Sequence, residues 1–136
     1  MSVLTPESPF DIVKAQISNI TDLLFIAMSR KEFFNKEVRR SVDKIRTLYK
    51  PEKIFVFGSY ATGKITADSD IDLFIIKKTT KPRRERQREV SRILIDREVP
   101  IDILVYTPAE TRRRERLGDP FILDILNSGK LVYAKE

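Results

Sequence analysis

Short apolar segments of β-forming residues alternate along this chain with segments whose apolar residues recur at helical spacing. Residues 54–57, 71–76 and 101–106 are rich in β-branched and aromatic residues, and residues 131–133 form a shorter segment of the same kind. Runs of this kind, bounded by Gly, Pro or Asp, are typical of β-strands. Because helices and strands interleave, we expect an α/β (α+β) domain with a small mixed β-sheet flanked by helices.

Two apolar stripes at helical spacing precede the first strand, and the sequence leaves open whether residues 29–31 interrupt the helix. Further helices are expected over residues 82–97 and 119–126, with Gly129 as a C-terminal cap. Residues 107–110 have the form of a capping box. We assign residues 1–31 to an N-terminal helical extension and residues 32–136 to the main domain. The two stripes consist of Val13, Ile17, Ile20, Leu24 and Met28, and then of Phe34, Val38, Val42, Ile45 and Leu48.

The chain contains no Cys and no His, and this absence excludes several classes of chemistry. A thiolate nucleophile, a Cys-ligated zinc site and a Ser-His-Asp triad are ruled out. Any metal site must consist of oxygen ligands, which suits magnesium, manganese or calcium. The net charge of +6 favours anionic partners. No apolar run is long enough to span a membrane, and the N-terminus lacks a signal-peptide pattern, so we expect a cytoplasmic protein.

The residues best suited to chemistry lie between the first two expected strands. Gly58 lets the backbone turn sharply and lets a phosphate approach the amides, and Ser59 adds a hydroxyl donor. Asp70 and Asp72 are two residues apart at the head of a strand, so both side chains project from one face and can converge on divalent ions. Carboxylates ~4 Å apart repel by roughly 4 kcal/mol at an effective dielectric of 20, so a cation is expected to neutralise them. A plain turn and a Lys or Arg partner remain open alternatives.

Asp102 lies within the apolar strand of residues 100–105, where both strand preference and desolvation disfavour it. We therefore expect Asp102 beside a cation or a functional site, and a buried salt bridge is the alternative. Lys64 is a possible phosphate contact in the loop, although loop lysines are more often simply solvated.

Taken together, Gly58–Ser59, the loop, Ser69–Leu73 and Asp102 resemble the signature of the DNA polymerase β-type nucleotidyltransferase superfamily. The resemblance covers about residues 32–133 and includes the ending at residues 129–133. It is closest to the minimal nucleotidyltransferase (MNT) family, whose members often occur as antitoxins beside HEPN-domain proteins. The resemblance implies the polymerase β-like nucleotidyltransferase fold.

The resemblance also implies a reaction: transfer of a nucleoside monophosphate, AMP from ATP, to a hydroxyl of a protein or RNA acceptor, with release of pyrophosphate. In this interpretation Asp70 and Asp72 bind two Mg²⁺ ions, and Asp102 completes one metal site and helps to deprotonate the acceptor. Gly58 and Ser59 hold the β- and γ-phosphates. The lack of His agrees with two-metal phosphoryl chemistry, which needs carboxylates rather than imidazole.

A different interpretation is a non-catalytic antitoxin that neutralises a partner protein by contact. Tyr60 follows Gly-Ser, where many members of the family carry a basic or aromatic residue, and because Tyr60 is not basic an arginine contact to phosphate is absent there. The small size of the domain indicates that a second copy or a HEPN-domain partner completes the pocket, as a homodimer or a hetero-complex. The N-terminal stripe is expected to pack on the core and to support dimerisation.

Arginines cluster at two places in the second half of the chain. At the start of the helix expected over residues 82–97, cations oppose the helix dipole, which indicates some other use for them. Contact with RNA or with an acidic partner protein and a merely solvated helix face are both open. The clusters consist of Arg83, Arg84, Arg86 and Arg88, and of Arg112, Arg113, Arg114 and Arg116.

Overall fold

Strand β1, Lys53–Phe57, lies inside the sheet and pairs antiparallel with β2, Ile71–Ile76, on one side and with β4, Lys130–Ala134, on the other. Strand β3, Ile101–Tyr106, pairs parallel with β2, which gives a four-stranded mixed sheet in the order β3-β2-β1-β4. This computed structural model describes residues 20–66 and 68–136. The expected mixed α/β architecture is therefore confirmed.

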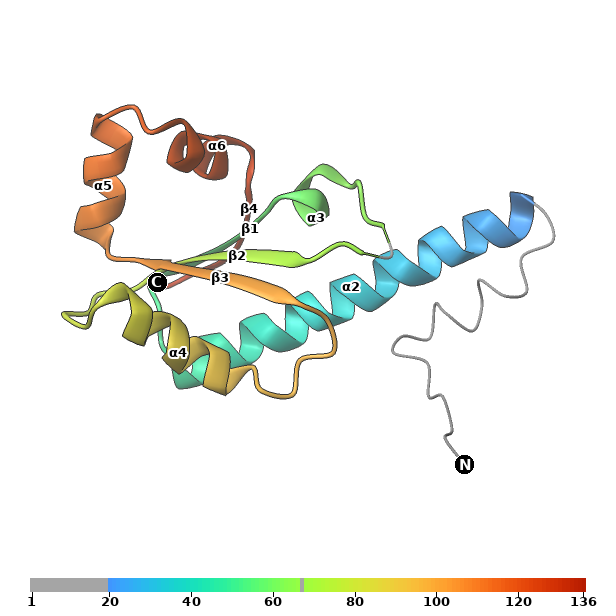
Figure 1. Cartoon of the computed structure of the whole chain (residues 1–136), viewed down its shortest axis with the longest axis horizontal. Helices are drawn as coiled ribbons and strands as arrows, with labels where there is room; N and C mark the ends of the chain where they lie inside the picture. Colours follow the sequence, from blue (N-terminus) through green and yellow to red (C-terminus); the bar gives the residue numbers. More distant parts are fainter. Residues whose placement is uncertain (1–19, 67) are drawn as a thin grey trace.

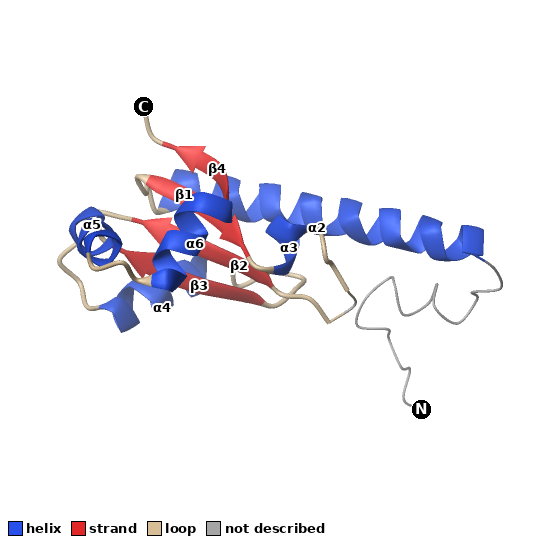
Figure 2. Ribbon diagram, turned by 90° about the horizontal axis from the view of Figure 1, so that it is seen from above, coloured by secondary structure: helices blue, strands red, loops and turns tan. Residues whose placement is uncertain are grey.

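Helices cover both faces of the sheet (Figures 1 and 2). The long helix α2 and helix α4 lie on one face, and α5 and α6 lie on the other. The short helix α3 follows β1 directly. The helices are α2 Ile20–Leu48, α3 Ser59–Thr62, α4 Arg83–Ile93, α5 Pro108–Arg116 and α6 Pro120–Ser128.

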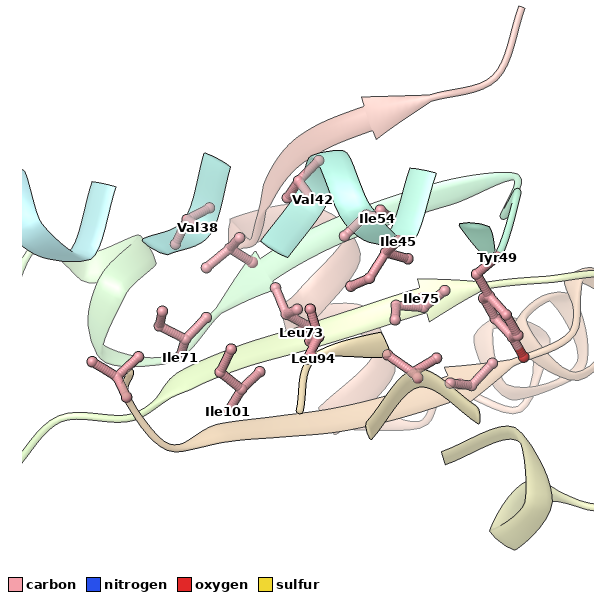
Figure 3. Close-up of a cluster of buried hydrophobic side chains, with 14 of the residues drawn as sticks. Val38, Val42, Ile45, Tyr49, Ile54, Ile71, Leu73, Ile75, Leu94 and Ile101 are labelled. Atoms are coloured by element: carbon pink, nitrogen blue, oxygen red, sulfur yellow. The ribbon is translucent and has the colours of Figure 1, made fainter. Parts of the chain in front are cut away.

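Alternation along β2 divides the core into two layers. Ile71, Leu73 and Ile75 are buried against α2 and α4, in the cluster that Figure 3 shows. Phe74 and Ile76 point to the opposite face, where they pack with the buried residues of α6. Asp72 belongs to this second set, because it alternates with Leu73. The polar residue thus stands on the α6 face without interrupting the larger apolar layer.

Helix α2 is continuous through residues 29–31, and the expected boundary between residues 31 and 32 falls inside it. Of the second stripe, all residues are buried except Leu48, which is 66% exposed; here the expectation was wrong. Tyr49 is buried instead, because it follows Ile45 by four residues and so stays on the same helix face.

The N-terminal part of α2 extends beyond the sheet (Figure 1). Ile20, Leu23 and Leu24 are exposed there, whereas Ile26 is buried. The first expected stripe is therefore not a core stripe at Ile20 and Leu24. Val13 and Ile17 of this stripe lie outside the described residues.

The arginines of α4 have two different uses. Arg86 is buried, donates to the carbonyl oxygens of Lys81 at 2.7 Å and Val105 at 3.2 Å, and pairs with Glu110 of α5 at 2.9 Å. Arg83 lies over the Tyr106 ring, 4.3 Å from its centroid. These two arginines connect α4 to β3 and α5, and the buried Arg86 fits neither of the two alternatives left open, contact with RNA or a partner and a solvated helix face.

The ends of α5 and α6 follow the sequence signals. Thr107 and Glu110 form the expected capping box at the start of α5. Asp119 caps α6 by accepting from the amides of Phe121 and Ile122. Gly129 is the expected C-terminal cap of α6 and has an extended conformation. A glycine is needed at this position because a Cβ would overlap the carbonyl oxygen of Ile125.

None of the helices in the described part of the chain combines the length and the apolar character that crossing a membrane requires.

We predict that Arg86→Met lowers the free energy of unfolding by about 3 kcal/mol, because it removes the buried ion pair with Glu110 and the donor to two carbonyl oxygens. The matched change Arg84→Met removes an exposed arginine of the same helix and is expected to alter stability by no more than about 0.5 kcal/mol. Urea unfolding of both variants measures the difference. Equal stabilities would contradict the structural role of Arg86.

Candidate active site

The candidate site lies at one end of the sheet, where β1 ends and β2 and β3 begin. Antiparallel pairing of β1 with β2 places Phe57 opposite Asp72, and parallel pairing of β2 with β3 places Asp72 beside Asp102. Both aspartates are the second residue of their strand, so their side chains point to the same face. The register of two strand pairs therefore brings together carboxylates that are 30 residues apart in the chain.

Gly58 connects β1 to α3 with φ 73° and ψ −147°, a conformation that residues with a Cβ rarely adopt. A Cβ at this position would overlap the carboxylate oxygen Oδ2 of Asp72. Two separate reasons therefore require a glycine at position 58: the positive φ of its backbone and the close approach of the Asp72 carboxylate. This contact joins two motifs that the sequence shows as separate.

Helix α3 is a single turn that begins at Ser59. The Ser59 carbonyl accepts from the Lys64 amide at 3.0 Å and from the Thr62 hydroxyl at 3.2 Å, which closes the turn. No hydrogen bond to the Ser59 hydroxyl is found within residues 20–66 and 68–136. Lys64 is exposed in the loop beyond α3, and its role toward phosphate stays a prediction.

Asp70 directly precedes β2. Its neighbour Ser69 bonds to Thr66 in both directions: the Ser69 hydroxyl accepts from the Thr66 amide at 2.7 Å, and the Ser69 amide donates to the Thr66 carbonyl at 3.2 Å. The Ile71 amide donates to the Pro100 carbonyl at 3.0 Å. These bonds fix the chain on both sides of Asp70 and hold the start of β2 against the start of β3.

The site concentrates negative charge. Burial raises the pKa of Asp72 to about 6, with further contributions from Asp102, within hydrogen-bonding reach, and from the charge of Asp70. Asp102 itself is exposed, because β3 is the edge strand and Asp102 is near its beginning. The sequence-based argument that Asp102 is desolvated inside an apolar strand was therefore wrong, although its position beside another functional candidate is as expected.

Asp70, Asp72 and Asp102 take part in no ion pair with any residue that the structure describes. The described residues also contain no group of three or more acidic side chains placed closely enough to hold a metal ion. Asp72 and Asp102 come together, whereas Asp70 acts on Asp72 only through its charge. The site is thus a carboxylate pair with a third acid nearby, and the lysine or arginine partner that was the alternative is not found there.

Tyr60, the residue directly after Gly58 and Ser59, connects α3 to α2. Its hydroxyl donates to the side-chain oxygen of Asn35, and the Lys130 ammonium lies 5.9 Å from its ring centroid. The pKa of Tyr60 is raised by burial. Sequence analysis did not identify Asn35, because its role depends on a helix 25 residues earlier in the chain.

The chain is similar to a known protein family and to solved structures. Residues 38–132 match the family model described as a nucleotidyltransferase domain. A candidate nucleotidyltransferase from Sulfolobus solfataricus has a similar structure, with 20% sequence identity, 80% of this chain and 87% of that chain covered, and a TM-score of 0.59. A toxin–antitoxin solved with AMP-PNP is similar over 74% of this chain and 73% of that chain, with 17% identity and a TM-score of 0.52. The search of curated proteins gave no match. At these identities the two structures establish the fold.

We predict that Gly58→Ala displaces Asp72 or strains the turn, with a loss of stability of about 1–3 kcal/mol. Gly63→Ala is the matched control, because Gly63 also has a positive φ, of 77°, but no other residue lies within 4 Å of its added Cβ. Thermal or urea unfolding compares the two variants. If Gly63→Ala costs as much as Gly58→Ala, the contact with Asp72 contributes nothing.

We predict that Asp72→Asn stabilises the metal-free protein at pH 7 by about 1 kcal/mol, a figure reduced for partial solvent exposure. The folded-state pKa of about 6 exceeds the ordinary value of 3.8, so the folded protein binds more protons between these values. The contribution of Asp72 to stability therefore falls as pH rises from about 4 to about 6. Urea unfolding with a chelator present, at pH 4 and pH 7, measures the difference between the two proteins, which cancels the effects of other groups. A difference that does not change with pH would contradict the raised pKa.

Proposed function

The chain belongs to the nucleotidyltransferase domain family, and from this premise we propose the reaction that it catalyses. The site transfers AMP from ATP to a hydroxyl of an acceptor and releases pyrophosphate. The observation that carries this proposal is the contact of Gly58 with Asp72 beside Asp102, because it joins the Gly58–Ser59 turn to a pair of carboxylates. We place the reaction in the cytoplasm, where its substrate ATP is available.

The carboxylate pair fits a hard divalent cation, and we propose Mg²⁺. The donor set consists of oxygens, and no lysine or arginine of the described residues forms an ion pair with it. Burial raises the pKa of Asp72, and the neighbouring charge of Asp102 raises it further. Asp72 and Asp102 would hold the cation, and Asp70 would join them in binding a second ion. Bound Mg²⁺ supplies charge stabilisation to the transferring phosphoryl group.

The residues of the chain have distinct proposed roles. Gly58 and Ser59 hold the β- and γ-phosphates, the Ser59 hydroxyl as a donor to a phosphate oxygen. Asp102 is the most exposed of the three carboxylates, and it accepts the proton of the attacking hydroxyl. Its exposure on the edge strand β3 leaves an acceptor free to approach from solvent.

We propose a protein hydroxyl, such as a tyrosine of a HEPN-domain partner, as the first acceptor, and an RNA end as the second. A likeness to a toxin–antitoxin solved with AMP-PNP, an analogue of ATP, supports the first. The second rests on Arg84, Arg88 and Arg92, which lie along one exposed side of α4 and form no ion pair with any described residue. Their spacing of four residues places like charges side by side, which is unfavourable without an anionic partner.

A non-catalytic antitoxin is the alternative function, and one observation favours it. The N-terminal part of α2 exposes Ile20, Leu23 and Leu24 beyond the sheet, which is the kind of apolar surface that a partner protein or a second copy covers. In that case the protein neutralises its partner by contact. Catalysis and contact make different predictions for the mass of the partner.

We predict that incubation with α-³²P-labelled ATP, Mg²⁺ and a HEPN-domain partner transfers label to the partner and adds one AMP to its mass. Asp72→Asn is expected to reduce transfer about 100-fold or more, because it removes one of the paired carboxylates. Asp124→Asn, which changes an exposed aspartate of α6, is the matched control and is expected to retain transfer. An RNA oligonucleotide is assayed in parallel as the second acceptor.

An inhibited partner of unchanged mass would support the non-catalytic alternative instead. Absence of label on either acceptor, together with absence of Mg²⁺-dependent ATP binding, would overturn the proposed reaction.

A further inference from the structure

An apolar surface borders the carboxylate pair on the α6 face of the sheet. Phe57 is the register partner of Asp72, and directly opposed residues in an antiparallel pair have Cβ atoms roughly 5 Å apart. Leu104 follows Asp102 by two residues on β3 and lies on the same face. Both side chains are only partly buried. The acidic group therefore continues directly into an apolar surface that is open to solvent.

Phe121, at the second position of α6, extends this surface. Its ring centroid lies 5.7 Å from that of Phe57, and the two rings are nearly perpendicular at 86°. The Asp119 cap accepts from the Phe121 amide at 3.0 Å and so fixes the backbone that carries the ring. Even with this contact, 49% of Phe121 remains exposed.

Core packing does not account for the exposed ring. Ile122 and Ile125, on the buried side of α6, are 0% and 1% exposed and fill the space against Phe55 and Phe74. A polar residue at position 121 would leave these contacts intact. An aromatic ring that is fixed at its backbone, half exposed and one side chain away from the carboxylates is suited to bind a flat apolar ligand group.

We propose that Phe121 stacks against the base of the nucleoside triphosphate whose phosphates bind at Gly58 and the carboxylate pair. This inference rests on the proposed function, and it assigns to that site a base-binding surface in addition to its phosphate-binding residues. The Cβ atoms of Asp72 and Phe57 are roughly 5 Å apart, and the rings of Phe57 and Phe121 follow with 5.7 Å between their centroids, a path along one side chain that a nucleoside triphosphate can span. Stacking on an aromatic ring tolerates any base and is strongest for the larger purine surface.

The absence of Trp from the sequence provides a direct test. Phe121→Trp introduces a single indole at the proposed stacking position, and addition of ATP with Mg²⁺ is expected to quench its fluorescence. Inorganic triphosphate, which has no base, is expected to leave the fluorescence unchanged. Leu117→Trp places an indole at another exposed position, just after α5, and is the matched control that ATP does not quench.

Affinity gives a second, independent readout. Phe121→Leu keeps an apolar side chain on α6 but removes the ring, and equilibrium dialysis is expected to show ATP binding weakened about tenfold. Competition by inorganic triphosphate is expected to be the same in the variant and the original protein. Circular dichroism confirms that both proteins are folded.

The possible failures are distinguishable. If ATP binds but neither the fluorescence of Phe121→Trp nor the affinity of Phe121→Leu changes, the stacking role is overturned and the proposed function is unaffected. If ATP and inorganic triphosphate both fail to bind the original protein in the presence of Mg²⁺, the phosphate site and the stacking role fail together.

Discussion

The close approach of Asp72 to the backbone of Gly58 is the constraint on which the candidate site depends. It requires that β1 end at Phe57 and that β2 place Asp72 opposite this residue, because a shift of one residue would turn Asp72 into the apolar layer. The same register places Asp72 beside Asp102. One steric contact therefore couples the pairing of three strands to the arrangement of the functional residues.

The two faces of the sheet differ in composition: one is apolar, and the other carries the acidic residues. Because of this division, the small sheet can carry an acidic group without losing its main apolar layer. The α2 and α4 face buries Ile71, Leu73 and Ile75 completely and carries most of the apolar packing. On the other face, the same strand carries Asp72 and then Phe74, so the apolar cluster under α6 begins only beyond the site. The repulsion between Asp72 and Asp102 is thus confined to the end of the sheet, where Asp102 is exposed to water.

Sequence patterns predicted the features that depend on local spacing. The strands, the capping box and the Asp119 cap follow from neighbouring residues, and all are present. Features that depend on tertiary contacts were not predictable in this way. The arginine cluster of α4 gave no sign that Arg86 is buried against Glu110. Gly129 is the C-terminal cap that was expected, but its spacing gave no sign that close approach to the Ile125 carbonyl requires a glycine there. The position of Phe121 beside Phe57 was missed for the same reason, since helix α6 is placed by long-range packing.

Asp72 and Asp102 form no ion pair with a described lysine or arginine, although the chain is rich in both. The chain has six more basic than acidic residues, so partners for acids are abundant. Elsewhere they are used: Arg40 and Lys44 bind Asp96, Arg86 binds Glu110, and Lys81 binds Glu89. Within the described residues, Asp72 and Asp102 receive no such partner, although a single lysine or arginine would relieve their repulsion. Asp72 and Asp102 lie beside each other without a side-chain cation from the described residues, so their charge is available to a ligand, and their oxygen donors favour a hard cation as the first part of that ligand.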